Sequence, residues 1–152
     1  MQVVYLNETT EFKDVKIVES KRQNKFGLMY GFETKLDLVT TEQMNDYYVF
    51  RSNDNDKWFI SLRTDSQIGQ ALKKISSSLN KEHGFNFKPE KEKVYIRMSG
   101  DQASSFPQNS NLLLSVKVYG VFLQHSTNLA FMQCELSDYK ASPLVNFNAM
   151  LP

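Results

Sequence analysis

The sequence predicts a mostly β fold, a β-barrel with one α-helix. Three observations lead to this fold class: short runs in which apolar and polar residues alternate, polar turn residues between these runs, and a single run with apolar residues at helical spacing. Aromatic residues, which favour strands, make up 12% of the chain. The 152 residues have the length of about one domain, so we expect these elements to share one core.

Six strands are predicted in the main part of the chain. They cover residues 27–40, 47–52, 57–63, 93–98, 113–123 and 129–139. Residues 53–56 (NDND) and 125–128 (HSTN) are turn signals, so we expect two hairpins. Residues 1–26 form an N-terminal extension with room for short strands, and residues 100–111 predict a long polar loop.

One helix interrupts the strands, over residues 66–82. Its apolar residues recur at helical spacing: Ile68, Ala71, Leu72, Ile75 and Leu79. Asp65 or Ser66 is the expected N-cap, and Gly84 marks the end of the helix. We expect its apolar face and Trp58 to pack in the core.

The order of these elements is typical of an OB-like barrel. An OB-fold is a five-stranded Greek-key barrel, and its helix lies between the third and fourth strands. The predicted helix has this place in the chain. The strand 129–139 is one more than the fold needs, and we expect it in an appended hairpin. Another α+β barrel or a sandwich is the alternative. We expect residues 1–140 to form a single domain and residues 141–152 to form a C-terminal tail.

The more polar faces of four predicted strands combine aromatic and cationic side chains. The candidates are Tyr47, Arg51, Phe59, Arg63, Tyr95, Arg97, Lys117 and Tyr119. Single-stranded nucleic acid needs both types, because its bases stack on aromatic rings and its phosphates bind cations. The sequence therefore predicts a nucleic-acid-binding groove into which these side chains converge, with Lys21, Arg22 and Lys25 as a basic flap. The alternative is an ordinary sheet surface, since cross-strand pairs of these types stabilise a sheet by about 0.2–1 kcal/mol.

A family resemblance supports the same prediction. Residues 112–141 (LLLSVKVYGVFLQHSTNLAFMQCELSDYKA) resemble the closing strands of OB-fold single-stranded DNA-binding proteins of large DNA viruses and related mobile elements. The run from Lys117 to Gly120 and the strand end from Asp138 to Lys140 carry the resemblance. It implies a viral protein that binds single strands without sequence preference during replication or recombination, often as an oligomer. DNA is favoured over RNA, although the residues themselves leave both ligands open. Many such proteins end in an acidic tail, whereas residues 143–152 are uncharged.

The tail has an interpretation of its own. Residues 141–152 include apolar side chains such as Leu144 and Phe147. They either fold back onto the domain or dock on a neighbouring subunit, which would give a homo-oligomer with head-to-tail contacts. A protein-interaction module that uses the aromatic strands and this tail is the second hypothesis, because Tyr and Arg are also enriched at protein interfaces.

Charge and hydropathy limit the partners. The 18 Lys and Arg residues nearly balance the 17 Asp and Glu residues, so a polyanion has to be held by a local patch. No apolar run reaches the roughly 18 residues of a membrane-spanning helix, and no targeting segment is evident. We expect a soluble intracellular protein, at a nuclear or cytoplasmic replication site, with no membrane partner.

Motifs for catalysis are missing from the sequence. There is no glycine-rich phosphate loop, no H-E-x-x-H and no C-x-x-C. The only cysteine, Cys134, alternates with Met132 and Leu136 on an apolar face, so we expect an inert core thiol rather than a nucleophile paired with His125. We therefore expect a protein that is not an enzyme and has no metal and no cofactor.

One acidic pattern leaves a third hypothesis open. Glu33, Lys35 and Asp37 resemble the carboxylate-x-Lys element of metal-dependent nucleases. Two carboxylates and a lysine can hold Mg²⁺ and orient a water molecule. Alternating charges on a solvated strand face explain the same pattern.

Overall fold

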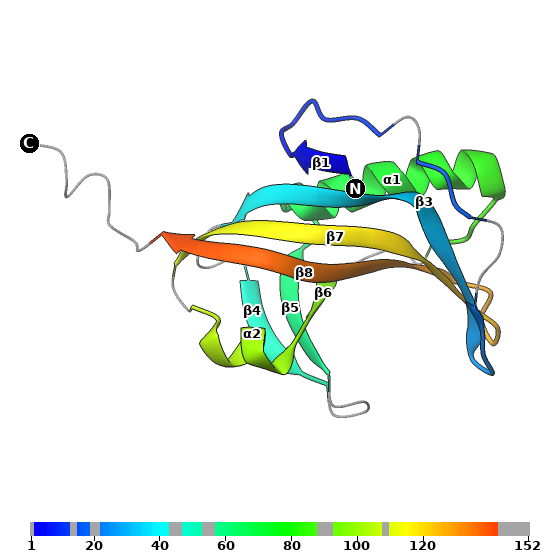
Figure 1. Ribbon diagram of the computed structural model, residues 1–152. Helices are drawn as coiled ribbons and strands as arrows, with labels where there is room; N and C mark the ends of the chain where they lie inside the picture. Colours follow the sequence, from blue (N-terminus) through cyan, green and yellow to red (C-terminus); the bar gives the residue numbers. More distant parts are fainter. Residues whose placement is uncertain are drawn as a thin grey trace, which may run out of the picture.

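The computed structural model describes residues 2–12, 15–18, 22–42, 47–52, 57–87, 93–107 and 110–142. These residues form one eight-stranded sheet and two helices, so the mostly β prediction is confirmed (Figure 1). The elements are β1 (Gln2–Tyr5), β2 (Arg22–Gln23), β3 (Gly27–Glu42), β4 (Tyr47–Arg51), β5 (Trp58–Arg63), α1 (Gln67–His83), β6 (Lys93–Met98), α2 (Gly100–Ser105), β7 (Asn111–Gln124) and β8 (Ala130–Ser142).

The sheet is an open path rather than a closed barrel. Its strand order is β1-β3-β7-β8-β6-β5-β4, and β2 pairs with β3 beside this path. Closure of a barrel requires the two end strands to be hydrogen-bonded, and no ladder joins β1 to β4 among the described residues.

The last strand is central, which corrects the expectation of an appended hairpin. β8 pairs with β7 in antiparallel fashion, as the turn at 125–128 predicts, but it also pairs with β6 in parallel through Arg97 and Glu135. β8 therefore joins the long strands β3 and β7 to the three-stranded unit β4-β5-β6.

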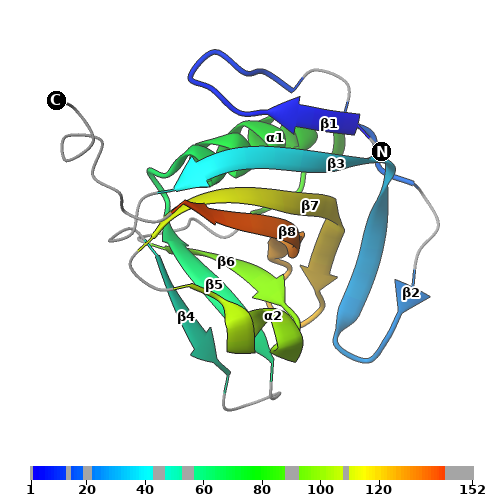
Figure 2. The same cartoon turned by 60° about the vertical axis from the view of Figure 1, so that its left-hand side comes forward.

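Irregular pairing bends the long strands. The β3–β7 register shifts between Gly31 and Leu36, and the β7–β8 register shifts between Val118 and Gly120. Such bulges bend a strand and increase its twist. Figure 2 shows the result: the first half of β3, with β2 beside it, turns away from the rest of the sheet. We call the strand segments beyond these shifts, residues 27–31, 120–124 and 130–133, the bent arm.

Helix α1 lies where it was predicted, between the third and fourth predicted strands. Ser66 is its N-cap and accepts a hydrogen bond from the Gly69 amide, and Gly84 ends it in the left-handed conformation with φ of 66°. The predicted apolar residues, such as Ile68, Ile75 and Leu79, are fully buried. They pack in one core with the inner face of the sheet, which includes Leu38 of β3.

Helix α2 replaces part of the predicted loop at 100–111. Its N-terminus carries a capping box: the Ser99 hydroxyl accepts from the Gln102 amide, and the Gln102 side chain accepts from the Ser99 amide. The S-x-x-Q spacing is a known start signal for a helix. The start of α2 could therefore have been predicted from the sequence.

The described part of the chain has no helix with the length and apolarity that crossing a membrane requires. Short strands do occur within residues 1–26, since β1 pairs with β3 in parallel and β2 pairs with β3 in antiparallel fashion. β8 extends to Ser142, and the residues after it lie outside the described part.

Candidate functional site

Three of the predicted site residues lie together on the outer face of β5 and β6. Phe59 is the direct cross-strand partner of Arg97, and Tyr95 is one position further along the same face of β6, opposite Ser61. The inner face carries the alternate residues Ile60 and Ile96, both fully buried. Since directly paired residues share a face, the register confirms that Phe59, Tyr95 and Arg97 point the same way.

An aromatic cluster occupies this outer face. Phe50 of β4 stacks on Phe59 with ring centroids 5.6 Å apart. The rings of Tyr95 and Phe50 meet edge to face, with centroids 5.5 Å apart. The rings of Tyr48 and Phe50 also pack together, with centroids 5.7 Å apart. Half of the Tyr95 side chain is exposed, at 50%. The cluster thus presents aromatic surface to solvent on three paired strands.

A cavity of about 560 Å³ lies beside this cluster, and we call it the β6–β8 cavity. β6 and β8 pair only at Arg97 and Glu135 in the described register, because the bent arm carries the first half of β8 away from β6. The lining joins outer-face residues such as Tyr95 to inner-face residues such as Val94, and it includes residues of α1 such as Leu72. The cavity therefore opens on the outer face between the two strands and reaches the helix.

Six aromatic and three cationic side chains are among the described residues that line the β6–β8 cavity. The aromatic ones are Phe59, Phe87, Tyr95, Tyr119, Phe122 and Phe131. The cationic ones are Lys57, Lys73 and Arg97. No carboxylate lines the cavity in the described part of the chain, although acidic and basic residues are almost equally numerous in the sequence. This composition favours an anionic ligand with flat rings.

Tyr119 lies on the same cavity as Tyr95. It is the extra residue of the β7 bulge, since Val118 pairs with Cys134 and Gly120 pairs with Gln133. Burial, and then the nearby charge of Glu135, raise the pKa of the Tyr119 phenol, which stays neutral at physiological pH. The predicted convergence therefore holds for four residues: Phe59, Tyr95, Arg97 and Tyr119.

Lys117 is next to this group but is held by an acid. Its Nζ atom lies 2.9 Å from Oε1 of Glu135, and the two side chains are 26% and 42% exposed. The hydrogen bond to Glu135, and then the attraction between their charges, raise the pKa of Lys117. Because Glu135 also pairs with Arg97 in the strand register, one carboxylate lies between two of the predicted phosphate-binding cations.

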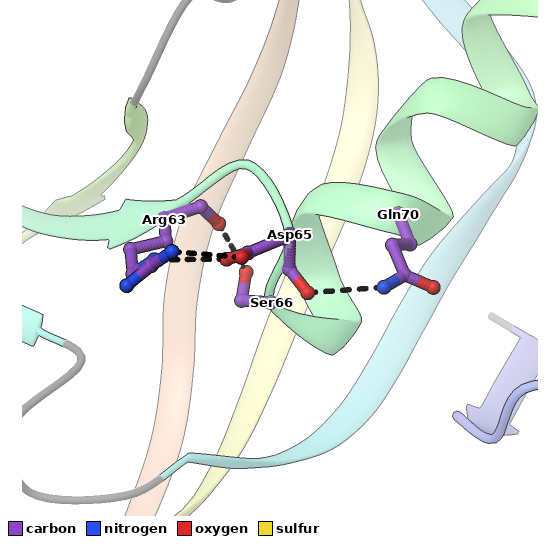
Figure 3. Close-up of polar contacts among 4 residues, drawn as sticks. All are labelled: Arg63, Asp65, Ser66 and Gln70. Carbon is purple, nitrogen blue, oxygen red and sulfur yellow. Dashed lines mark hydrogen bonds and ion pairs between the residues drawn. The ribbon is translucent and has the colours of Figure 1, made fainter.

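Arg63 is hydrogen-bonded to the turn that leads into α1. Its guanidinium donates two hydrogen bonds to Asp65, at 3.0 and 2.9 Å, while the Ser66 hydroxyl donates to the Arg63 carbonyl at 2.6 Å. Gln70 donates to the Asp65 carbonyl at 3.0 Å, which completes the set drawn in Figure 3. Arg63 is on the predicted face of β5 but does not line the β6–β8 cavity.

Tyr47 and Arg51 lie on the opposite face from the other candidates, which corrects their place in the predicted groove. They pair with Leu62 and Trp58, which belong to the inner-face alternation of β5. The Tyr47 hydroxyl donates to the Pro107 carbonyl at 3.0 Å, and burial raises its pKa. The guanidinium of Arg51 lies 6.0 Å from the centre of the Trp58 ring.

The sequence did not identify Tyr48 and Phe50 as the β4 residues that share the face of Phe59. In the run YYVFR both faces carry an aromatic residue, so alternation alone cannot select the outer face. The face follows from the register of the hairpin, in which Phe50 pairs with Phe59.

The aromatic residues of the bent arm were missed for a different reason. The sequence places Phe122 on the apolar face with Val118, but the bulge at Tyr119 shifts the alternation so that Val121 is buried instead. Phe122 and its cross-strand partner Phe131 then line the cavity. Lys73 of α1 also lines the cavity. The sequence predicts only that the apolar face of this helix packs in the core.

Of the predicted basic flap, Arg22 and Lys25 are exposed beside the start of β3, and Lys25 lies 4.9 Å from the centre of the Phe26 ring. Neither lines the β6–β8 cavity. Lys21 lies outside the described residues.

Of the groups considered for catalysis, Cys134 is buried, Asp37 is hydrogen-bonded to two serines, and Glu33 and Lys35 are exposed on β3. Burial raises the pKa of the Cys134 thiol to about 12, so the thiol stays protonated, whereas His125 is exposed in the β7–β8 turn. The Asp37 carboxylate accepts hydrogen bonds from the hydroxyls of Ser115 and Ser137, at 2.6 and 3.2 Å. Within the described ranges, no group of three or more His, Cys, Asp and Glu residues could hold a metal ion.

Comparison with known proteins gives no match: no family model, no curated protein and no solved structure is similar enough to this chain to match it.

Proposed function

We propose that this protein binds single-stranded nucleic acid at the β6–β8 cavity and the adjoining aromatic cluster. The carrying observation is the composition of the lining: aromatic rings and cations together, with no carboxylate among the described residues. Bases stack on Tyr95, Tyr119 and Phe59, while phosphates lie against Arg97, Lys57 and Lys73. A duplex is a weaker ligand, because its bases already stack on each other and offer no free face.

The proposed binding is OB-like in its mode, in that a curved β surface presents rings and cations at fixed spacing. DNA is the favoured ligand, in line with the resemblance of residues 112–141 to viral OB-fold single-stranded DNA-binding proteins. We propose a role in coating single strands during replication or recombination, without catalysis.

The test is a fluorescence-anisotropy titration of the protein with oligo-dT and with a duplex of the same length, at several salt concentrations. If three cations each neutralise one phosphate, the logarithm of affinity falls with the logarithm of salt with a slope of about −2. The duplex binds more weakly at every salt concentration. Absence of oligo-dT binding at about 50 mM salt would contradict the proposal.

Assembly through residues 141–152 stays a prediction, because residues 143–152 lie outside the described part. Light scattering of the full chain and of a chain that ends at Lys140 tests it. A change of assembly that leaves DNA binding intact would favour the protein-interaction module instead.

A further inference from the structure

The β6–β8 cavity is deeper than stacking on a surface requires. Its floor consists of apolar residues that belong to the inner face and to α1: Leu72, Val94, Met132 and Cys134. We propose that the cavity holds one unstacked nucleobase of the bound strand, inserted between β6 and β8 with α1 as one wall. This inference rests on the proposed function and adds a specific subsite to it.

The size of the cavity leaves room for a flat ring that enters from the outer face. Its volume of about 560 Å³ lies within the range of about 300–1,000 Å³ of ligand pockets. Tyr95 and Tyr119 both line the cavity, and Tyr95 is half exposed, so that a base can contact these rings as it enters. An apolar floor takes up the ring without leaving a buried charge unpaired.

The α1 wall offers polar groups for the edge of a base. Ser76, Ser77 and Asn80 line the cavity from the exposed side of the helix. The serine hydroxyls donate to the carbonyls of Leu72 and Lys73, at 2.8 and 3.0 Å, so their oxygens still have acceptor lone pairs. The Asn80 amide offers two donors and an acceptor.

Charge at the mouth positions the strand for this insertion. Lys73 on α1 and Arg97 on β6 lie on two of the elements that form the cavity walls, and both are exposed. Phosphates on either side of the inserted nucleotide can reach one cation each. Insertion needs a nucleotide without a pairing partner, because extrusion from a duplex costs a few kcal/mol.

The experiment fills the cavity from the α1 wall and leaves the outer-face residues unchanged. Ser76→Phe and Asn80→Phe each add a ring inside the cavity, whereas Ser78→Phe adds the same ring to a residue that is half-buried like Ser76 but does not line it. The probes are oligo-dT of about 15 nucleotides and an abasic strand of the same length, which has the phosphates without the bases. Thermal unfolding verifies that each variant folds. If Ser76→Phe fails to fold, Asn80→Phe still tests the inference, because Asn80 is exposed and tolerates a larger side chain.

We expect both cavity variants to weaken oligo-dT binding by about tenfold or more, with Ser78→Phe close to wild type. Binding of the abasic strand is weak and does not change among the variants. If wild type binds oligo-dT and both cavity variants bind it equally well, base insertion is wrong while the proposed function stands. If wild type does not bind oligo-dT, the proposed function is wrong and the insertion inference with it.

Discussion

At the scale of single residues, Glu135 is predicted to weaken binding. Its Oε1 atom lies 2.9 Å from Nζ of Lys117. In the strand register, Glu135 is the partner of Arg97. A phosphate has to compete with this carboxylate for Lys117. Glu135 therefore limits the affinity of the site, although it does not line the cavity itself.

We predict that Glu135→Gln strengthens binding of oligo-dT. The variant releases Lys117 for one more phosphate contact, so the slope of log affinity against log salt becomes steeper by about 0.7. Glu33→Gln is the matched control, because it changes the net charge equally at an exposed position of β3. Equal effects of the two variants in a salt titration would show that only the overall charge matters.

Cys134 gives stability a predictable dependence on pH. Burial raises the pKa of its thiol from 9.0 to about 12. Between these values the folded protein keeps the proton while the unfolded chain loses it, so the free energy of unfolding falls as pH rises. One such group lowers it by about 1.4 kcal/mol per pH unit in this window.

Urea unfolding between about pH 8 and 11 measures this effect in wild type and in Cys134→Ala. Tyrosines and lysines titrate in the same range in both proteins, so the difference between the two slopes isolates the thiol. We expect a shallower slope in the variant. Identical slopes would mean that Cys134 is accessible to solvent.

At the scale of elements, the bends in β3 and β7 create the site. Gly31 and Gly120 are direct cross-strand partners where the bent arm begins. A Cβ atom on Gly120 would lie 2.2 Å from the Tyr30 carbonyl oxygen, whereas a Cβ on Gly31 would meet nothing within 4 Å. At this pair of residues, the close approach of β3 to β7 therefore needs glycine only at position 120.

We predict that Gly120→Ala lowers the free energy of unfolding by about 1–3 kcal/mol, because the backbones must separate. Gly31→Ala changes it by less than about 0.5 kcal/mol. Chemical denaturation of the two variants measures both values. A large loss for Gly31→Ala, or none for Gly120→Ala, would show that the strands pair differently.

The elements themselves were largely predictable, because their signals are local. The period of α1 and its Ser66 cap, and the alternation in β6, gave bounds within a residue or two of those observed. The face of the sheet on which a side chain lies was less predictable. The outer face of β4 depends on hairpin register, and the face of Phe122 depends on a bulge that alternation does not reveal.

At the scale of the whole molecule, strand order could not be predicted. The position of β8 between β7 and β6 depends on contacts between residues far apart in the chain, such as Arg97 with Glu135. The same placement opens the β6–β8 cavity and brings α1 into the candidate site. Lys73 and Asn80 consequently had no signal in the sequence beyond their exposed position on a helix.

The central claim is that Tyr95 and Tyr119, from separate strands, stack bases at one site. The direct test is oligo-dT affinity of the double variant Tyr95→Ala/Tyr119→Ala, with Tyr5→Ala as control, because Tyr5 is a 74% exposed tyrosine that does not line the cavity. We predict that the double variant loses about 2–6 kcal/mol of binding free energy and that the control loses none. A loss below about 0.5 kcal/mol in a folded double variant would assign both rings to the stability of the sheet and contradict the claim.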